Sequence, residues 1–191
     1  EVVTYDANSN SAMLLANEKQ FGIKGIPSYH FDKADVIVNF NADFLGTWIS
    51  PVQFAHQWAK NRKIKDAHHA HMSRMIAFES HMTLTGSNAD NRVVIKPSEL
   101  GLAIAKVHNE VAKAMGGTTV SVSGNLSDKA EKGAKAAAKD LIEAAKKGKH
   151  TLVVSGSNNT AEQMLVNNLN EMLGNYGHSI DWNRQHRNSQ T

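Results

Sequence analysis

The stretch MIAFESHMTLTGSNADNRVVIKPSE, residues 75–99, decides the fold of this chain. It opens with a short apolar run, Met75–Phe78, gives way to polar residues after Glu79, and returns to an apolar run, Val93–Ile95, just before Pro97. Short apolar runs without strict alternation are typical of strands that are covered on both faces. A proline in front of an amphipathic segment is typical of a helix start. The stretch therefore predicts two strands of an α/β sheet, followed by a helix.

The same alternation of strand and helix signals continues on both sides of this stretch. Further strands are predicted at Val2–Tyr5, Val36–Phe40 and Thr151–Val154. Helices are predicted at residues 11–20 and 97–115, and a further helix starts at a capping box formed by Ser50 and Gln53. Two more helices are predicted, one between a Ser127 cap and Gly148, and one between a capping box at Thr160 and Gln163 and Gly174. Strands that alternate with helices form parallel sheets. The predicted fold class is α/β, Rossmann-like, with a mostly parallel sheet and helices on both faces.

The composition of successive segments predicts how the chain is organised. We expect residues 1–115 to form a Rossmann-like lobe and residues 116–127, GGTTVSVSGNLS, to be a candidate linker. Residues 128–177 are expected to form a helix-strand-helix unit that continues the α/β fold. Residues 178–191 are expected to form a polar tail that is loose at its end. Because residue 1 is Glu, we expect the chain to be an excised or processed piece.

Charge and composition argue against several function classes. The chain has 191 residues and no cysteine, which excludes disulfides, zinc fingers and cysteine-ligated iron–sulfur clusters within it. No apolar run approaches the roughly 20 residues that span a bilayer. Much of the net charge of +3 comes from lysines in residues 129–149, which are interleaved with acidic residues. That mixture is typical of a solvated helix face, so we expect no nucleic-acid partner.

Familiar catalytic and metal-binding patterns are missing. His68, His69 and His71 lie close together in DAHHAH, but residues one and two apart share no helix face, and only on a strand would His69 and His71 do so. We expect a solvated connector there rather than a metal site. SGSNN at residues 155–159 lacks the Gly-x-Ser-x-Gly elbow, and no dinucleotide fingerprint or Walker loop occurs. No catalytic residue and no metal ligand is therefore assigned.

The remaining candidates follow three predicted strands. Asn41 to Asp43, Glu79 to Thr83, and Ser155 to Ser157 each come at or just after a strand end. In an open parallel sheet these loops gather at the carboxyl edge, where ligands bind. A carboxylate such as Glu79 can accept hydrogen bonds from a ribose or a guanine edge, and hydroxyl and backbone N–H groups can hold phosphate. The alternative is that these residues are ordinary loop polars and helix caps, which the pattern alone favours.

Four segments resemble, in order, segments of the molybdopterin oxidoreductase (DMSO reductase) family, and the resemblance covers most of residues 34–177. They are ADVIVNFNADF, MIAFESHMTLTGSNADNRVVIKPSELGLAIAKV, TLVVSGSNN and LNEMLGNYG. More narrowly, FDKADVIVNFNADFLGTWISPVQF together with MTLTGSNAD is similar to the molybdopterin-oxidoreductase-like part of the large iron–sulfur subunit of alternative complex III. That bacterial membrane assembly oxidises quinol. Its molybdoenzyme-like part is thought to carry no molybdenum cofactor.

The resemblance implies a set of cofactor-binding positions, either working or vestigial. They are Asn41, Asp43, Glu79, His81, Thr83, Ser155 and Gly156. Asn41 stands where the family has glycine, which lets a backbone approach a pyrophosphate. His81 stands where the family has arginine, a bidentate phosphate partner, whereas Thr83 and Pro97 are kept. These departures imply weakened nucleotide binding.

The resemblance therefore implies a fragment of a molybdopterin oxidoreductase-like redox subunit. We expect a non-catalytic scaffold domain of a quinol-oxidising electron-transfer complex, with no cofactor of its own. Its partners would be the rest of the parent polypeptide, including an iron–sulfur part, and other subunits of a membrane-bound complex on the periplasmic side of the bacterial inner membrane. The alternative is a genuine oxidoreductase domain in which Asp43, Glu79, Thr83 and Ser155 hold one arm of a molybdopterin guanine dinucleotide. A third reading is a free-standing small-molecule-binding domain.

Overall fold

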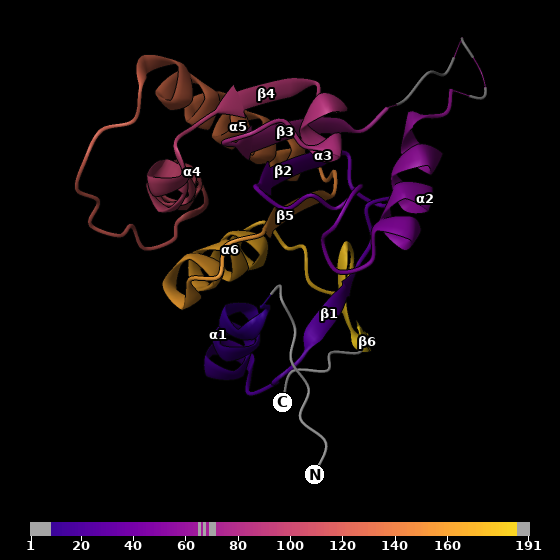
Figure 1. The fold of residues 1–191 in the computed structure, drawn as a ribbon, viewed down its shortest axis with the longest axis horizontal. Coiled ribbons are helices and arrows are strands. Elements are labelled where there is room, and N and C mark those ends of the chain that lie inside the picture. Colours follow the sequence, from indigo (N-terminus) through magenta and orange to yellow (C-terminus); the bar gives the residue numbers. More distant parts are fainter. Residues whose placement is uncertain (1–8, 65, 67, 69–71, 187–191) are drawn as a thin grey trace.

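A four-stranded parallel sheet forms the centre of the molecule (Figure 1). The computed structural model describes residues 9–64, 66, 68 and 72–186. The sheet has the order β4-β3-β2-β5 and contains β2 (Val36–Phe40), β3 (Arg74–Glu79), β4 (Asn91–Val94) and β5 (Thr151–Ser155). From β2 the chain moves outward through β3 to β4, and then returns to place β5 on the other side of β2. The order of succession thus reverses between β2 and β5, which makes their boundary a topological switch point.

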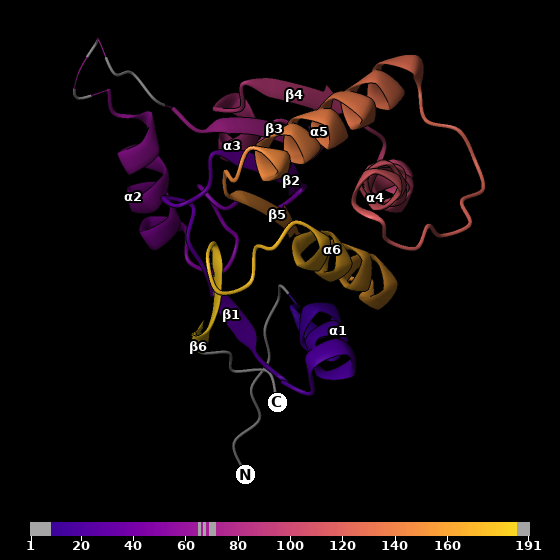
Figure 2. The same ribbon diagram turned by 180° about the vertical axis from the view of Figure 1, so that it is seen from behind.

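Helices cover both faces of this sheet (Figures 1 and 2). Val36, Val38 and Phe40 pack against α4 (Leu100–Met115), α5 (Asp128–Lys146) and α6 (Thr160–Met172). On the opposite face Ile37 belongs to a second cluster, with side chains from α1 (Ser11–Phe21) and α2 (Pro51–Arg62). All five residues of β2 are buried, as expected for a strand covered on both faces. The mixed α/β class and the parallel sheet flanked by helices are therefore confirmed.

A separate antiparallel pair of strands was missed by the sequence analysis. β1 (Ile26–Tyr29) pairs with β6 (Ile180–His186), with an irregular register between Pro27 and Ser28. The expectation of a polar tail is therefore wrong for residues 180–186, which form a strand. Proline usually argues against a strand, which hid β1, and the alternating polar residues of β6 hid its partner.

Aromatic packing explains why the polar β6 is ordered. The Trp182 ring lies 5.5 Å from that of Phe21 and 6.4 Å from that of Tyr176, measured between ring centroids.

Some of the predictions fall outside the described residues. They concern the strand Val2–Tyr5, the end of the chain at residues 187–191, and His69 and His71.

The predicted helix starts lie where they were expected, but only some of the predicted capping residues make a capping hydrogen bond. Ser127 caps α5, since its Oγ accepts from Ala130 N at 3.3 Å. The Ser50 hydroxyl makes no capping bond and reaches only the Gln53 side chain. Asn159, and not Thr160, caps α6 by accepting from two backbone N–H groups. A 3-10 turn over Pro97–Glu99 precedes α4.

Amide and hydroxyl side chains close the free edge of β5. Asn170 accepts from Val153 N at 3.0 Å and donates to Val153 O at 2.9 Å, as a neighbouring strand would. The Ser179 hydroxyl donates to Thr151 O at 2.6 Å. Gln163 donates to Ser155 O at 3.0 Å. The switch-point strand is thereby fixed on both sides.

Residues 116–127 connect α4 to α5 without a helix or strand after the left-handed Gly116. The connection is held against α4 because Asn109 both donates to Val120 O and accepts from Val120 N, at 2.8 Å each. β5 follows α5 and pairs with β2, so the segment 128–177 adds to the same sheet.

Candidate functional site

Two adjoining hollows lie at the carboxyl edge of the sheet, around the switch point. The larger has a volume of about 690 Å³ and the smaller about 540 Å³. Asn41, His81, Gly156 and Asn158 line both of them. These four residues follow β2, β3 and β5, so the three strand ends do meet at one rim. We call this region the carboxyl rim.

The ends of β2 and β5 touch backbone to backbone. Gly156 N donates to Phe40 O at 2.9 Å, and a Cβ atom on Gly156 would lie only 2.3 Å from Asn41 O. No side chain fits in that space without moving the backbone, so Gly156 is required for this close approach. The glycine therefore shapes the floor of the rim.

Two residues with left-handed backbone line the larger hollow. Asn41 has φ 55° and Ile49 has φ 53°, and within the described ranges no other non-glycine residue has positive φ. Asparagine tolerates this conformation, but for a β-branched residue such as Ile49 it is a true outlier that costs of order 1–3 kcal/mol. Backbone strain of this kind is concentrated at functional sites and ligand clamps.

The side chain of Asn41 contains a buried oxygen without a partner. Its Oδ1 atom is shielded from solvent and accepts no hydrogen bond within the described part of the chain. Its neighbour Asn39 differs, because Asn39 Oδ1 accepts from Ala42 N at 2.8 Å. A buried acceptor that is left unpaired costs about 1–3 kcal/mol. Asn41 lines both hollows, while its unpaired Oδ1 atom lies behind their accessible surface.

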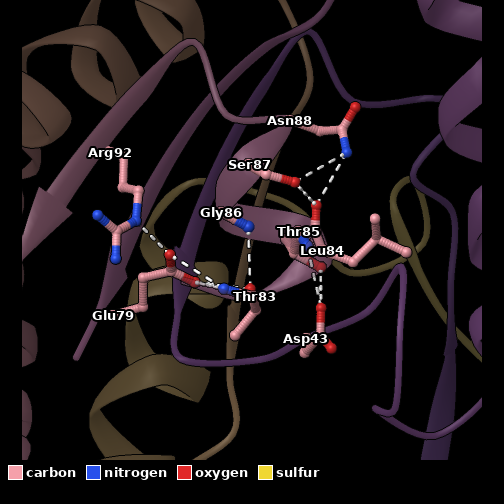
Figure 3. A network of polar contacts seen from close by, with 9 residues as sticks. All are labelled: Asp43, Glu79, Thr83, Leu84, Thr85, Gly86, Ser87, Asn88 and Arg92. Atoms are coloured by element: carbon pink, nitrogen blue, oxygen red, sulfur yellow. Dashed lines mark hydrogen bonds and ion pairs between the residues drawn. The ribbon is translucent and has the colours of Figure 1, made fainter. Parts of the chain in front are cut away.

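Asp43 lines the larger hollow. Thr85 holds its side chain in place (Figure 3). Its Oδ1 accepts from Thr85 N at 3.0 Å and from Thr85 Oγ1 at 2.8 Å. Thr85 belongs to the short helix α3 (Leu84–Ser87) and its hydroxyl also accepts from Leu45 N. These bonds join the loop after β2 to the loop after β3 and fix the position of the carboxylate.

Glu79 does not face a ligand space. It is 1% exposed, forms an ion pair with Arg92, and accepts from Thr83 Oγ1 at 2.6 Å (Figure 3). Thr83 Oγ1 in turn accepts from Gly86 N and so caps α3. The Glu79 carboxylate, which was predicted to bind a ribose or guanine, therefore has its partners inside the protein.

The other predicted positions divide between the rim and the interior. His81 is exposed and lines both hollows, and Thr83 lines the larger one. Ser155 is buried, accepts from Ser157 N at 3.1 Å, and lines neither of the two hollows. Of the seven predicted cofactor-binding residues, the structure brings Asn41, Asp43, His81, Thr83 and Gly156 to the rim, and leaves Glu79 and Ser155 behind it.

Several rim residues were not predicted. Trp48 and Ile49 form an apolar part of the larger hollow, and Glu162 contributes a carboxylate to the smaller one. Asn158 also accepts from Ala12 N at 3.1 Å, which ties the start of α1 to the rim. Asn158 falls inside the quoted SGSNN motif, whereas Trp48 and Glu162 carry no signal in the sequence.

Charge at the rim is negative. Asp43 lines the larger hollow and Glu162 the smaller, and among the described residues no lysine or arginine lines either hollow. Hydroxyl and amide groups make up most of the remaining polar surface. This set of groups suits a ligand that donates hydrogen bonds or carries positive charge.

No family model matches this sequence, and no curated protein matches it. Among the described residues there is no group of three or more His, Asp or Glu side chains that could hold a metal ion. Within the same residues, no helix has the length and apolar character needed to cross a bilayer.

Proposed function

We propose that the chain is a Rossmann-like domain of a molybdopterin oxidoreductase-like redox subunit, in which it serves as a non-catalytic scaffold. The observation that carries this proposal is the charge of the carboxyl rim. A carboxylate lines each hollow, and within the described part of the chain neither hollow is lined by a lysine or arginine. A nucleotide site at a switch point needs the opposite arrangement, because a pyrophosphate is anionic.

The topology supports the Rossmann-like part of the proposal. Renumbered along the chain, the order β4-β3-β2-β5 is 3-2-1-4, which corresponds to one half of a doubly wound sheet together with the first strand of the other half. Three of the four segments that resemble the molybdopterin oxidoreductase family contain a residue of the rim, namely Asn41, His81 and Gly156. This common location supports the proposal.

The residues of the rim do not fit a molybdopterin guanine dinucleotide. Asn41 fills the place where a glycine would admit a pyrophosphate, and Asp43 adds negative charge beside it. Glu79 and Ser155, two of the four residues that would hold the nucleotide arm, are buried and engaged elsewhere. Quinol oxidation, the iron–sulfur partner and the periplasmic location belong to the proposed parent complex and not to this domain alone.

A genuine cofactor-binding domain is the rival proposal. The position of the 690 Å³ hollow at a switch point favours it, since ligands of open α/β sheets bind there. Negative charge at the same place argues against a dinucleotide, so the scaffold remains our proposal.

Two measurements test the proposal. Metal analysis of the parent protein is expected to find no molybdenum or tungsten in stoichiometric amount. Thermal unfolding of this chain with about 1 mM GDP is expected to show no rise in Tm, whereas a site with a Kd near 10 μM would add about 2.7 kcal/mol of stability. Stoichiometric molybdenum, or a clear GDP-dependent rise in Tm, would overturn the scaffold assignment.

A further inference from the structure

We propose that the larger hollow and its apolar lip bind a protein segment in which an arginine or lysine lies between apolar side chains. The apolar lip consists of Met82 and Leu84. This inference rests on the proposed scaffold function, because it names the surface through which the scaffold holds its partner.

Among the described residues, the polar wall of the hollow contains the carboxylate of Asp43 and no lysine or arginine. Asp43 is fixed by two bonds from Thr85 to one of its oxygens, so its carboxylate needs no reorganisation when a cation arrives. A guanidinium or ammonium group carries only donors, so it matches this wall in both charge and hydrogen-bonding capacity.

The lip supplies the apolar half of the surface. Met82 is 67% exposed and Leu84 is 56% exposed, and they are separated only by Thr83. Met82 lines the larger hollow, and Leu84 precedes Thr85, the residue that holds Asp43 (Figure 3). Two exposed apolar side chains beside a polar hollow offer a partner apolar area to cover, and methionine adapts its shape to a partner.

The position of the lip identifies the occupant as a polypeptide segment. Trp48 and Ile49 line the hollow itself, so a small cationic molecule inside it would already have an apolar wall. Such a molecule would leave Leu84 in water, since Leu84 does not line the hollow. A segment with apolar residues on either side of its cation covers the hollow and the lip together.

Methionine methyl resonances provide the test. The chain is labelled with ¹³C-methyl methionine and titrated with acetyl-Leu-Arg-Leu-amide, acetyl-Leu-Glu-Leu-amide or acetyl-arginine-amide. We expect the Leu-Arg-Leu peptide to shift the Met82 signal saturably in the millimolar range while Met115, exposed at the end of α4, stays in place. The Glu peptide is expected to cause no shift, and acetyl-arginine-amide to bind several-fold more weakly.

A matched pair of variants locates the charge. Asp43→Asn is expected to raise the Kd of the Leu-Arg-Leu peptide about five- to tenfold. Glu143→Gln removes one carboxylate from the exposed face of α5 and is expected to leave the Kd unchanged. The signals of the buried Met13 and Met75 report whether each variant has kept its fold.

Each contrary outcome has one meaning. Equal shifts from the Arg and Glu peptides, no shift of Met82, or an unchanged Kd in a folded Asp43→Asn variant would overturn the inference while leaving the scaffold function intact. Equal affinity for acetyl-arginine-amide would replace the protein segment by a small cationic ligand. A Met82 shift on addition of GDP would instead count against the proposed function itself.

Discussion

Asn39 and Asn41 lie two positions apart at the end of β2, and their side-chain oxygens are used differently. The Asn39 oxygen accepts from Ala42 N and so closes the turn, whereas the Asn41 oxygen is buried without a partner in the described structure. Asn41 also has a left-handed backbone, which glycine adopts without strain. The stability of the rim should therefore respond in opposite directions to glycine at these two positions.

We expect Asn41→Gly to leave the free energy of unfolding unchanged or to raise it by about 1 kcal/mol, because it removes an unpaired acceptor and backbone strain. We expect Asn39→Gly to lower it by at least about 1–2 kcal/mol, since it removes a buried hydrogen bond from a strand. Urea unfolding of both variants checks the contrast. A clear loss of stability in Asn41→Gly would mean that the Asn41 side chain has a partner in solution.

The Glu79–Arg92 ion pair shows what the sequence analysis could not reach at the residue scale. Glu79 was recognised as a special carboxylate, but Arg92 was not assigned to it. Arg92 lies 13 residues further along the chain on the neighbouring strand, and only the register of β3 and β4 brings the two together. The ends of the predicted strands were enough to locate the rim. Whether a side chain there faces a ligand or pairs inside the protein depends on contacts between separate strands.

Removal of one member of this pair should be far more harmful than removal of both. Because Glu79 is 1% exposed, Arg92→Met would leave its carboxylate buried and uncompensated, and we expect a loss of about 3–5 kcal/mol in unfolding free energy. The double variant Glu79→Gln, Arg92→Met is expected to recover a large part of that loss. Chemical denaturation of the single and double variants measures the coupling, and additive losses would contradict it.

At the scale of elements, strands with continuous apolar runs were predictable and strands with polar residues were not. β2, β3 and β5 lie where their apolar runs predicted them. β1 and β6 are stabilised by pairing with each other and by aromatic contacts across the chain, which no local pattern encodes. The closure of β5 by Asn170 is likewise a contact between separate elements, and it can be tested directly.

Replacement of Asn170 should open the edge of β5. In Asn170→Leu the N–H and C=O groups of Val153 lose their buried partners, and we expect a loss of about 2–4 kcal/mol together with a greater tendency to aggregate. Asn170→Asp keeps an acceptor for Val153 N but puts a buried carboxylate oxygen against the carbonyl oxygens of Val153 and Val166, so its loss should be at least as large. Thermal unfolding combined with light scattering separates the two variants, and equal stability of all three proteins would rule out this role for Asn170.

At the scale of the whole molecule, buried histidines make the folded state sensitive to acid. Burial lowers the pKa of His108 on α4, although its contact with Asn109 opposes this, and burial also lowers the pKa of His186 on β6. The unfolded chain protonates these histidines near pH 6.5, whereas the folded chain does so only at lower pH. The unfolded state therefore binds more protons in that interval, and stability present above pH 6.5 is lost as the pH falls through it.

We expect the unfolding free energy to decrease between pH 7.5 and 5.5, by no more than about 1.4 kcal/mol per pH unit for each histidine. His108→Leu should give a shallower dependence on pH, because it removes one of the groups. Urea unfolding at several pH values measures both slopes. Identical slopes in the two proteins would show that His108 does not contribute to this dependence.

The pairing of β1 with β6 also has a consequence for the order of events during synthesis on the ribosome. Residues 26–29 find their strand partner only when residues 180–186 have emerged. At a translation rate of roughly 5–20 residues per second, the roughly 150 intervening residues take about 8–30 s. Throughout that time the nascent chain carries an unpaired β1, which is the interval in which it most needs protection by a chaperone.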